Sequence, residues 1–156
     1  MYQAFAGWQN RPSEKVTING GVHYTHFALN NQHIVEPRLG VSWQVNPRHT
    51  LTFANGMHNR ADAVSVYFSE ITGANGNVST PNKNLKIQRN IHSVIGHQVA
   101  IAEGLNLKTE AYFQYIYDAA TGTDTNNYYS LMNEVDLYNV KALENKGKGR
   151  NYGIDV

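Results

Sequence analysis

The chain has 156 residues with 13 Lys and Arg against 12 Asp and Glu, so its formal net charge is +1. The basic residues are scattered, whereas a nucleic-acid partner normally requires a concentrated basic surface, so we expect no nucleic acid to bind. Cysteine is absent, which excludes a disulfide scaffold and thiolate metal sites. No apolar run approaches about 18 residues, and the N-terminus lacks the features of a signal peptide, so we expect neither a transmembrane helix nor a signal peptide.

Alternation of apolar and polar residues predicts seven long strands, because successive side chains of a strand point to opposite faces. In chain order they cover residues 2–9, 15–27, 35–45, 50–58, 90–101, 105–118 and 143–156. The pattern is clearest in 105–118, where Leu107 and Phe113 fall in one row and Lys108 and Glu110 in the other. This run is much longer than the usual strand of about 5–6 residues.

The connections between these strands alternate in length. Tight turns are expected at 10–14, 46–48 and 102–104, and longer connections at 28–34, 59–89 and 119–142. In an up-and-down antiparallel sheet, alternate connections lie at the same end, so short turns occupy one end and long loops the other. Transmembrane β-barrels of the bacterial outer membrane have this asymmetry, and most of the strands reach the roughly 9–11 residues that a bilayer requires.

Alternation alone does not say which face is outside. A soluble sandwich buries its apolar row, whereas a membrane barrel turns that row toward lipid. The apolar rows end in aromatic residues, with Trp43 near the tight turns and Tyr24, Tyr115 and Tyr117 near the long loops. Interfacial belts of membrane proteins are built in this way, which favours the barrel.

Three segments carry sequence motifs that resemble a known family. Residues 35–58 contain PRLG-x-S-x-Q followed by HTL-x-x-A-x-G, and residues 82–118 contain K-x-x-R-x-x-H followed by L-x-L-K-x-E-A-Y-x-Q. Residues 144–156 contain E-N-x-G-x-G-R-x-Y-G-I-D. Together these segments resemble the C-terminal part of the β-barrel of TonB-dependent outer-membrane receptors.

The resemblance implies a barrel of about 22 strands with a plugged lumen. Residues 1–156 would then be a single partial transmembrane β-barrel segment, all-β, with about seven strands and without the plug domain or the final strand. It implies a non-enzymatic importer in the outer membrane of a Gram-negative bacterium, for a siderophore, cobalamin or glycan-type ligand. The implied partners are outer-membrane lipid, the plug of the same receptor, the TonB complex acting through that plug, and the small-molecule or glycan ligand.

Two other hypotheses stay open at this point. The chain could be a small self-contained outer-membrane barrel or adhesin of about eight strands. It could also be a soluble antiparallel β-domain that binds carbohydrate.

Candidate ligand-binding residues fall into two groups. Arg38, Lys108 and Glu110 lie on the inferred lumen face, together with Glu36 and Asp155, where ion pairs within the barrel or packing against the plug are the alternative. Aromatic residues of the long loops form the second group, since exposed aromatics over a rigid scaffold often bind ligands. These are Tyr67, Phe68, Tyr128 and Tyr129, with packing against neighbouring loops as the alternative.

The seven histidines suggest no metal site, because none makes an evident hairpin or helical ligand pair with a carboxylate. We therefore expect no metal, no cofactor and no catalytic residues. Asn55, Ser93 and His97 fall on the inferred lipid face, where a polar group is costly unless it is hydrogen-bonded. Either these positions lie near an interface or the sequence has diverged there.

A basic row follows the last long connection. Glu144, Lys146, Lys148 and Arg150 share the outward row of the last predicted strand. Such a row, placed above the aromatic belt, could meet lipid phosphates. A solvated face is the simpler alternative.

Overall fold

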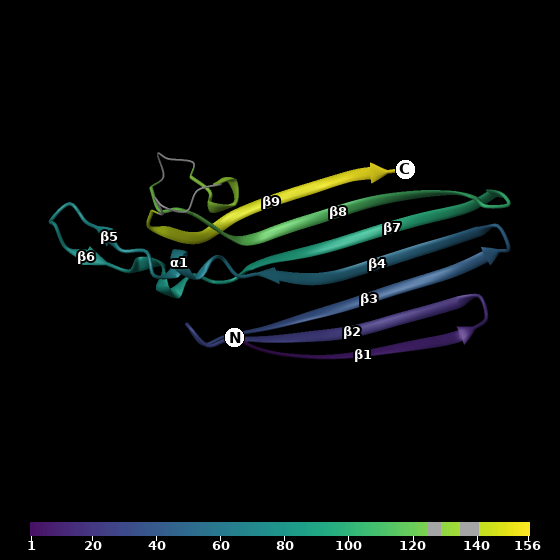
Figure 1. Cartoon of the computed structure of the whole chain (residues 1–156), viewed down its shortest axis with the longest axis horizontal. Helices are drawn as coiled ribbons and strands as arrows, with labels where there is room; N and C mark the ends of the chain where they lie inside the picture. The colour runs from purple at the N-terminus through teal and green to yellow at the C-terminus, as the bar shows by residue number, and fades with distance from the viewer. Residues whose placement is uncertain (125–128, 135–140) are drawn as a thin grey trace.

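In the computed structural model, residues 1–124, 129–134 and 141–156 are described. Seven long strands form one antiparallel sheet in the order β1-β2-β3-β4-β7-β8-β9 (Figure 1). Their bounds are β1 (Tyr2–Ser13), β2 (Val16–Phe27), β3 (Gln32–Asn46), β4 (His49–Arg60), β7 (Gln88–Ala102), β8 (Leu105–Gly122) and β9 (Leu143–Asp155). The predicted all-β meander is confirmed. Within the described residues β1 and β9 do not pair with each other, so the sheet is open.

The observed strands are longer than predicted, and two connections are correspondingly shorter. The predicted turn at 10–14 is wrong for most of its length, because β1 continues to Ser13 and the turn occupies residues 14–15. Pro12 lies inside a register shift between Asn10 and Ser13, where the missing N–H breaks no ladder hydrogen bond. The connection predicted at 28–34 is reduced to residues 28–31, with Asn31 at a left-handed φ of 56°.

Short turns and long loops lie at opposite ends of the sheet, as predicted (Figure 1). Turns at 14–15, 47–48 and 103–104 close one end. Asn46 stabilises the second of these, since its Oδ1 accepts the N–H groups of Arg48 at 2.9 Å and His49 at 3.0 Å. Residues 28–31, 61–87 and 123–142 connect the strands at the other end.

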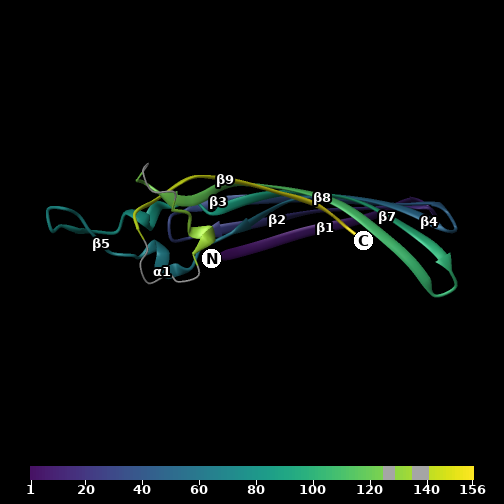
Figure 2. The ribbon, with the colours of Figure 1, turned by 90° about the horizontal axis from the view of Figure 1, so that it is seen from above.

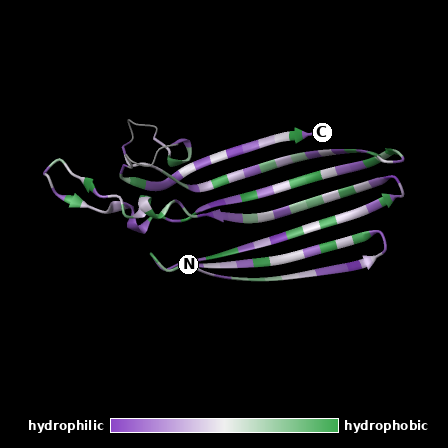
Figure 3. Cartoon of the chain, in the orientation of Figure 1, coloured by the Kyte–Doolittle hydropathy of each residue, from purple (hydrophilic) through white to green (hydrophobic). Residues whose placement is uncertain are grey.

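The strand register gives the sheet two consistent faces, which we call the apolar face and the polar face. One row of directly paired residues on the apolar face is Val41, Phe53, Ile95, Ala111 and Ile154. One row on the polar face is Arg38, Gly56, His92, Gln114 and Asn151. Along each strand, hydrophobic and hydrophilic residues accordingly alternate (Figure 3).

No second layer covers the apolar face among the described elements. Ile95 is 62% exposed, Ile154 is 71% exposed and Phe53 is 41% exposed. A soluble antiparallel sheet would bury such a face against a core. The exposure is instead what a lipid-facing surface requires.

The main buried cluster lies at the loop end, against residues of the polar face. The loop elements are α1 (Val64–Tyr67), β5 (Ile71–Thr72), β6 (Val78–Ser79), η1 (Pro81–Asn84) and η2 (Leu131–Asn133). The buried residues of this loop core are Phe27, Ile34, Val66, Tyr67, Leu85, Ile87, Ala120, Leu131 and Leu143. Figure 2 shows α1 on one side of the arched sheet. Through this core the long loops are attached to the strands.

Helices of the described ranges are too short or too polar to cross a membrane.

Candidate functional site

Glu36 is the centre of a polar cluster on the polar face, near the loop end of β2, β3 and β4. Glu36 is only 4% exposed, although its side chain is a carboxylate. His23, directly opposite on β2, forms a hydrogen bond from its Nδ1 to Glu36 Oε2. The backbone N–H of Asn59 donates to Glu36 Oε1 at 2.6 Å, and Arg38 Nη2 lies 4.0 Å from the same oxygen. These donors offset the cost of removing the carboxylate from water.

The backbone explains why a carboxylate is needed there. The ladder between β3 and β4 ends at the Arg38–Gly56 pair, and the next residue of β3 toward the loops is Pro37, which has no N–H. Beyond that point Asn59 lacks a carbonyl acceptor on β3, and the Glu36 side chain accepts its N–H instead. Glu36 therefore joins two strands where their backbone pairing stops.

The His23–Glu36 contact corrects one inference from the sequence. We expected no histidine to pair with a carboxylate across a hairpin, and this pair does so. The side chains lie opposite each other only because of the β2–β3 register, which the sequence pattern does not specify to one residue. Among the described residues there is no group of three or more His, Asp or Glu side chains that could hold a metal ion.

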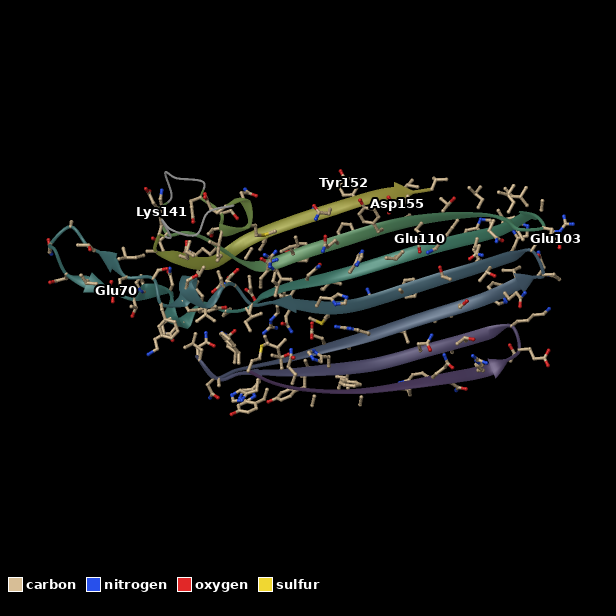
Figure 4. The ribbon with its side chains drawn as sticks, viewed as in Figure 1. Glu70, Glu103, Glu110, Lys141, Tyr152 and Asp155 are labelled. Atoms are coloured by element: carbon tan, nitrogen blue, oxygen red, sulfur yellow. The ribbon has the colours of Figure 1, made fainter. Side chains whose placement is uncertain are left out.

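A second polar site lies on β7, β8 and β9, nearer the turn end. Lys108 Nζ binds Glu110 Oε2 at 2.8 Å, and Glu110 lies directly opposite Asp155. Figure 4 shows these two carboxylates on neighbouring strands, away from Glu103 at the tight turn. A groove of about 360 Å³ is lined here by His92, Val94, Glu110, Tyr112, Gln114 and Asp155. Because two like charges face each other and only Glu110 has a cationic partner within the described ranges, the groove is acidic.

The three lumen-face candidates do not form one site. Arg38 is on β3, whereas Lys108 and Glu110 are on β8, three strands away in the sheet. Neighbouring strands are about 4.8 Å apart, so the separation across the sheet alone is about 14 Å. Arg38 belongs to the Glu36 cluster, and Lys108 and Glu110 belong to the acidic groove.

The loop aromatics divide into buried and exposed residues. For Tyr67 the structure agrees with the alternative of packing within the loops: it is 0% exposed, and its ring lies 5.2 Å from the ring of Phe27 in the loop core. Burial and the negative charge of Asp62 raise the pKa of Tyr67 to about 12. Phe68, the next residue, is 51% exposed and can contact a ligand.

The second loop pair is only partly described. Tyr129 is partly buried against the loop core, and Lys141 Nζ lies 5.3 Å above its ring. Burial, together with the charge of Glu134, raises the pKa of Tyr129. Tyr128 lies outside the described residues.

Asn82 is a loop residue that the sequence pattern did not single out. It is 0% exposed, donates from Nδ2 to the Lys141 carbonyl at 2.9 Å and accepts the Leu143 N–H on Oδ1 at 2.9 Å. It therefore connects the 61–87 loop to the start of β9. An asparagine within a polar tract carries no sequence signal for this role, whereas the nearby apolar Leu85 and Ile87 do indicate a buried segment.

The unexpected polar residues of the apolar face are paired with one another. Asn55 Nδ2 donates to Ser93 Oγ at 2.7 Å across the β4–β7 pair. His97 stacks on His49 with ring centres 5.2 Å apart, and their ring nitrogens lie 3.0 Å apart. His49 is the first residue of β4, so this second pair lies near the turn end, where an interface is expected.

A comparison with known families agrees with this architecture. A family model described as "TonB dependent receptor-like, beta-barrel" matches residues 1–156. A search of curated proteins found no match. Members of this family are transport proteins of the Gram-negative outer membrane and are not enzymes, which accords with a long-stranded sheet whose apolar face is exposed. The chain belongs to the family of TonB-dependent receptor-like β-barrels.

Proposed function

We propose that this chain forms part of the wall of an outer-membrane importer, with its polar face along the path of a siderophore, cobalamin or glycan-type ligand. The acidic groove on β7–β9 is the observation that carries the proposal. It combines carboxylates, an imidazole, an amide and the Tyr112 ring on a rigid sheet. Such a mixture of polar groups and an aromatic surface suits a ligand rich in hydroxyl and amide groups.

Within this proposal the candidate residues have different roles. Lys108 and Glu110 act at the groove, and the exposed Phe68 acts at the loops. Arg38 retains a side chain that is 52% exposed beside the Glu36 cluster, so it can contact either a ligand or a plug domain. Tyr67 is assigned to the loop core. Tyr128 and Tyr129 stay as loop candidates.

The proposed partners follow from the two faces. Lipid would cover the apolar face, and a plug domain would pack against the polar face and pass energy from the TonB complex. Further strands beyond β1 and β9 would close the barrel. The open seven-stranded sheet does not favour the alternative of a small self-contained barrel.

Ligand binding by the full chain in detergent tests the groove. Equilibrium dialysis against a ferric siderophore, cobalamin and an oligosaccharide would identify the class that binds. We expect Glu110→Gln to weaken that binding by about tenfold, because one charged hydrogen bond is replaced by a neutral one. Glu103→Gln is the matched control, since Glu103 is an exposed carboxylate at the tight turn (Figure 4). Equal affinity of the two variants, or no binding of any of the three ligands, would overturn the proposal.

A further inference from the structure

A hollow on the apolar face at the loop end is lined by both tyrosines and lysines. It has a volume of about 620 Å³ and includes Tyr115 and Tyr117 of β8 and Lys146 and Lys148 of β9. The two tyrosine rings are stacked, with centres 5.9 Å apart. Because the lining comes from β7, β8 and β9, the hollow does not depend on the open edge of β9 alone.

Among the described residues, two of the cations at or beside this hollow have no anionic partner. Lys146 Nζ binds Glu144 Oε2 at 2.7 Å, and Arg89 Nε lies 4.0 Å from Asp118 Oδ2. By contrast, neither Lys148 nor Arg150 forms an ion pair with any residue in the described ranges.

The ring of Tyr115 fixes one of these cations in position. The Arg150 guanidinium carbon lies 6.0 Å from the centre of the Tyr115 ring, within cation–π range. We call Lys148, Arg150, Tyr115 and Tyr117 the basic patch. Two acidic side chains lie close by, Glu144 and Asp118, and each already has a cationic partner.

The register places the basic patch at the edge of the exposed apolar surface. Arg150 pairs with Tyr115, and the next row on the same face, toward the tight turns, is Tyr152 and Phe113. Successive residues on one face of a strand are about 7 Å apart. Arg150 therefore lies about 7 Å from Tyr152 along β9, on the side toward the long loops. The exposed fractions of Tyr152 and Phe113 are 76% and 44%.

If lipid covers the apolar face, Tyr115, Tyr117, Lys148 and Arg150 are the residue types that favour the headgroup region. Tyrosine rings favour the interface, and Lys and Arg near the surface are attracted to anionic lipids. Long cationic side chains also extend from an apolar surface toward the polar headgroups. Because lipid covers this face, a lipid phosphate reaches these side chains more readily than a dissolved anion does.

We propose that the basic patch binds the phosphate of an anionic lipid headgroup in the leaflet on the side of the long loops. Lys148 supplies a mobile charge, Arg150 supplies a guanidinium held over Tyr115, and the tyrosine pair packs against the upper part of the lipid. This lipid site is on the opposite face from the acidic groove and is independent of the imported ligand. Failure of one proposal leaves the other intact.

The experiment compares two lipids that differ only in the phosphate. The full chain in a non-ionic detergent is mixed with phosphatidic acid or with diacylglycerol of the same acyl chains, and retained lipid is counted by native mass spectrometry. We expect phosphatidic acid to be retained and diacylglycerol to be lost. The Lys148→Ala/Arg150→Ala variant should bind phosphatidic acid on the order of tenfold more weakly.

Two further variants separate a specific site from general charge attraction. Lys148→Arg/Arg150→Lys keeps both charges and should retain the lipid, which excludes loss through misfolding. Lys15→Ala/Arg48→Ala removes the same charge from exposed residues at the tight-turn end and should leave binding unchanged. Equal weakening by both alanine pairs, or none by Lys148→Ala/Arg150→Ala, would overturn the proposal. Complete displacement of the lipid by millimolar inorganic phosphate would also overturn it, because the site would then be one for a free anion.

Discussion

At the scale of single residues, polar side chains on the apolar face are tolerated because they satisfy one another. Asn55 and Ser93 lie opposite each other on β4 and β7 and share a hydrogen bond of 2.7 Å. A hydrogen-bonding group facing hydrocarbon without a partner would cost several kcal/mol. The pair explains why an asparagine can occupy a lipid-facing row without implying that the sequence has lost its function.

A double-mutant cycle tests this pairing. We expect Asn55→Ala and Ser93→Ala to be coupled by about 1 kcal/mol in the free energy of unfolding, measured by urea titration in detergent micelles. Asn55→Ala combined with Thr109→Ala is the control, because these residues share no contact, and it should be additive. Coupling as small as that of the control pair would contradict the hydrogen bond.

Tyr67 gives the folded chain a specific pH dependence. Its pKa is raised from 10.0 to about 12, first by burial and then by the charge of Asp62. Between these values the unfolded chain loses the phenol proton while the folded chain keeps it, so stability falls as pH rises. We expect Tyr67→Phe to lose less stability between pH 10 and 12 than the wild type does, measured by urea unfolding at each pH. If the free energy of unfolding of Tyr67→Phe fell with pH as steeply as that of the wild type, the Tyr67 hydroxyl would not be the source of the pH dependence.

At the scale of elements, the upper part of β8 pairs with β9 through an irregular region. The register shifts between Ile116 and Ala120, and Asp118 has a left-handed φ of 54°. Asn145 fixes this region by donating to the carbonyls of Asp118 at 2.7 Å and Lys86 at 3.0 Å. The close approach of the two strands requires a residue without a side chain at position 147.

Gly147→Ala tests this requirement. A Cβ at Gly147 would lie 2.8 Å from the Ala119 carbonyl oxygen and 2.9 Å from the Ala119 Cβ, both of which belong to a buried part of β8. We expect a loss of about 1–3 kcal/mol in the free energy of unfolding, because backbone must move. Gly149→Ala is the matched control on the same strand, since its nearest atom is Ile116 Cδ1 at 3.5 Å. A similar stability of the two variants would contradict the tight approach.

At the scale of the whole molecule, the sheet has two open edges and one exposed apolar face. Each outer strand, β1 and β9, presents unpaired backbone groups along one side within the described residues. Such edges pair readily with other chains, and a large apolar surface promotes association in water. A micelle or bilayer covers the apolar surface and so prevents the association that this surface would cause in water.

We therefore expect the chain to be extracted from membranes only by detergent and to aggregate when the detergent is removed. Cell fractionation and sedimentation in the two conditions measure this. A monodisperse chain with a cooperative unfolding transition in plain buffer would contradict the lipid-facing assignment of the apolar face. It would favour the alternative of a soluble β-domain.

Much of this architecture could be predicted from the residues because a strand has a period of two. Within 105–118, alternation alone places Phe113 and Glu110 on opposite faces of the strand. The same alternation predicts the seven strands, and the tight turns between them predict the short-turn end of the sheet. The placement of Arg38, Lys108 and Glu110 on the polar face was predictable for the same reason. Strand ends were less predictable, since β1 continues through Pro12 by means of a bulge.

By itself the sequence determined the strands, their order and the two chemically distinct faces, because these depend on local alternation and turn residues. Only the tertiary structure decided which polar residues meet and which loop residues are buried. Tyr67 is buried by its contact with Phe27, and Glu36 meets the Asn59 N–H, through contacts between segments far apart in the chain. Such contacts depend on strand register and loop docking, which no local pattern of residues encodes.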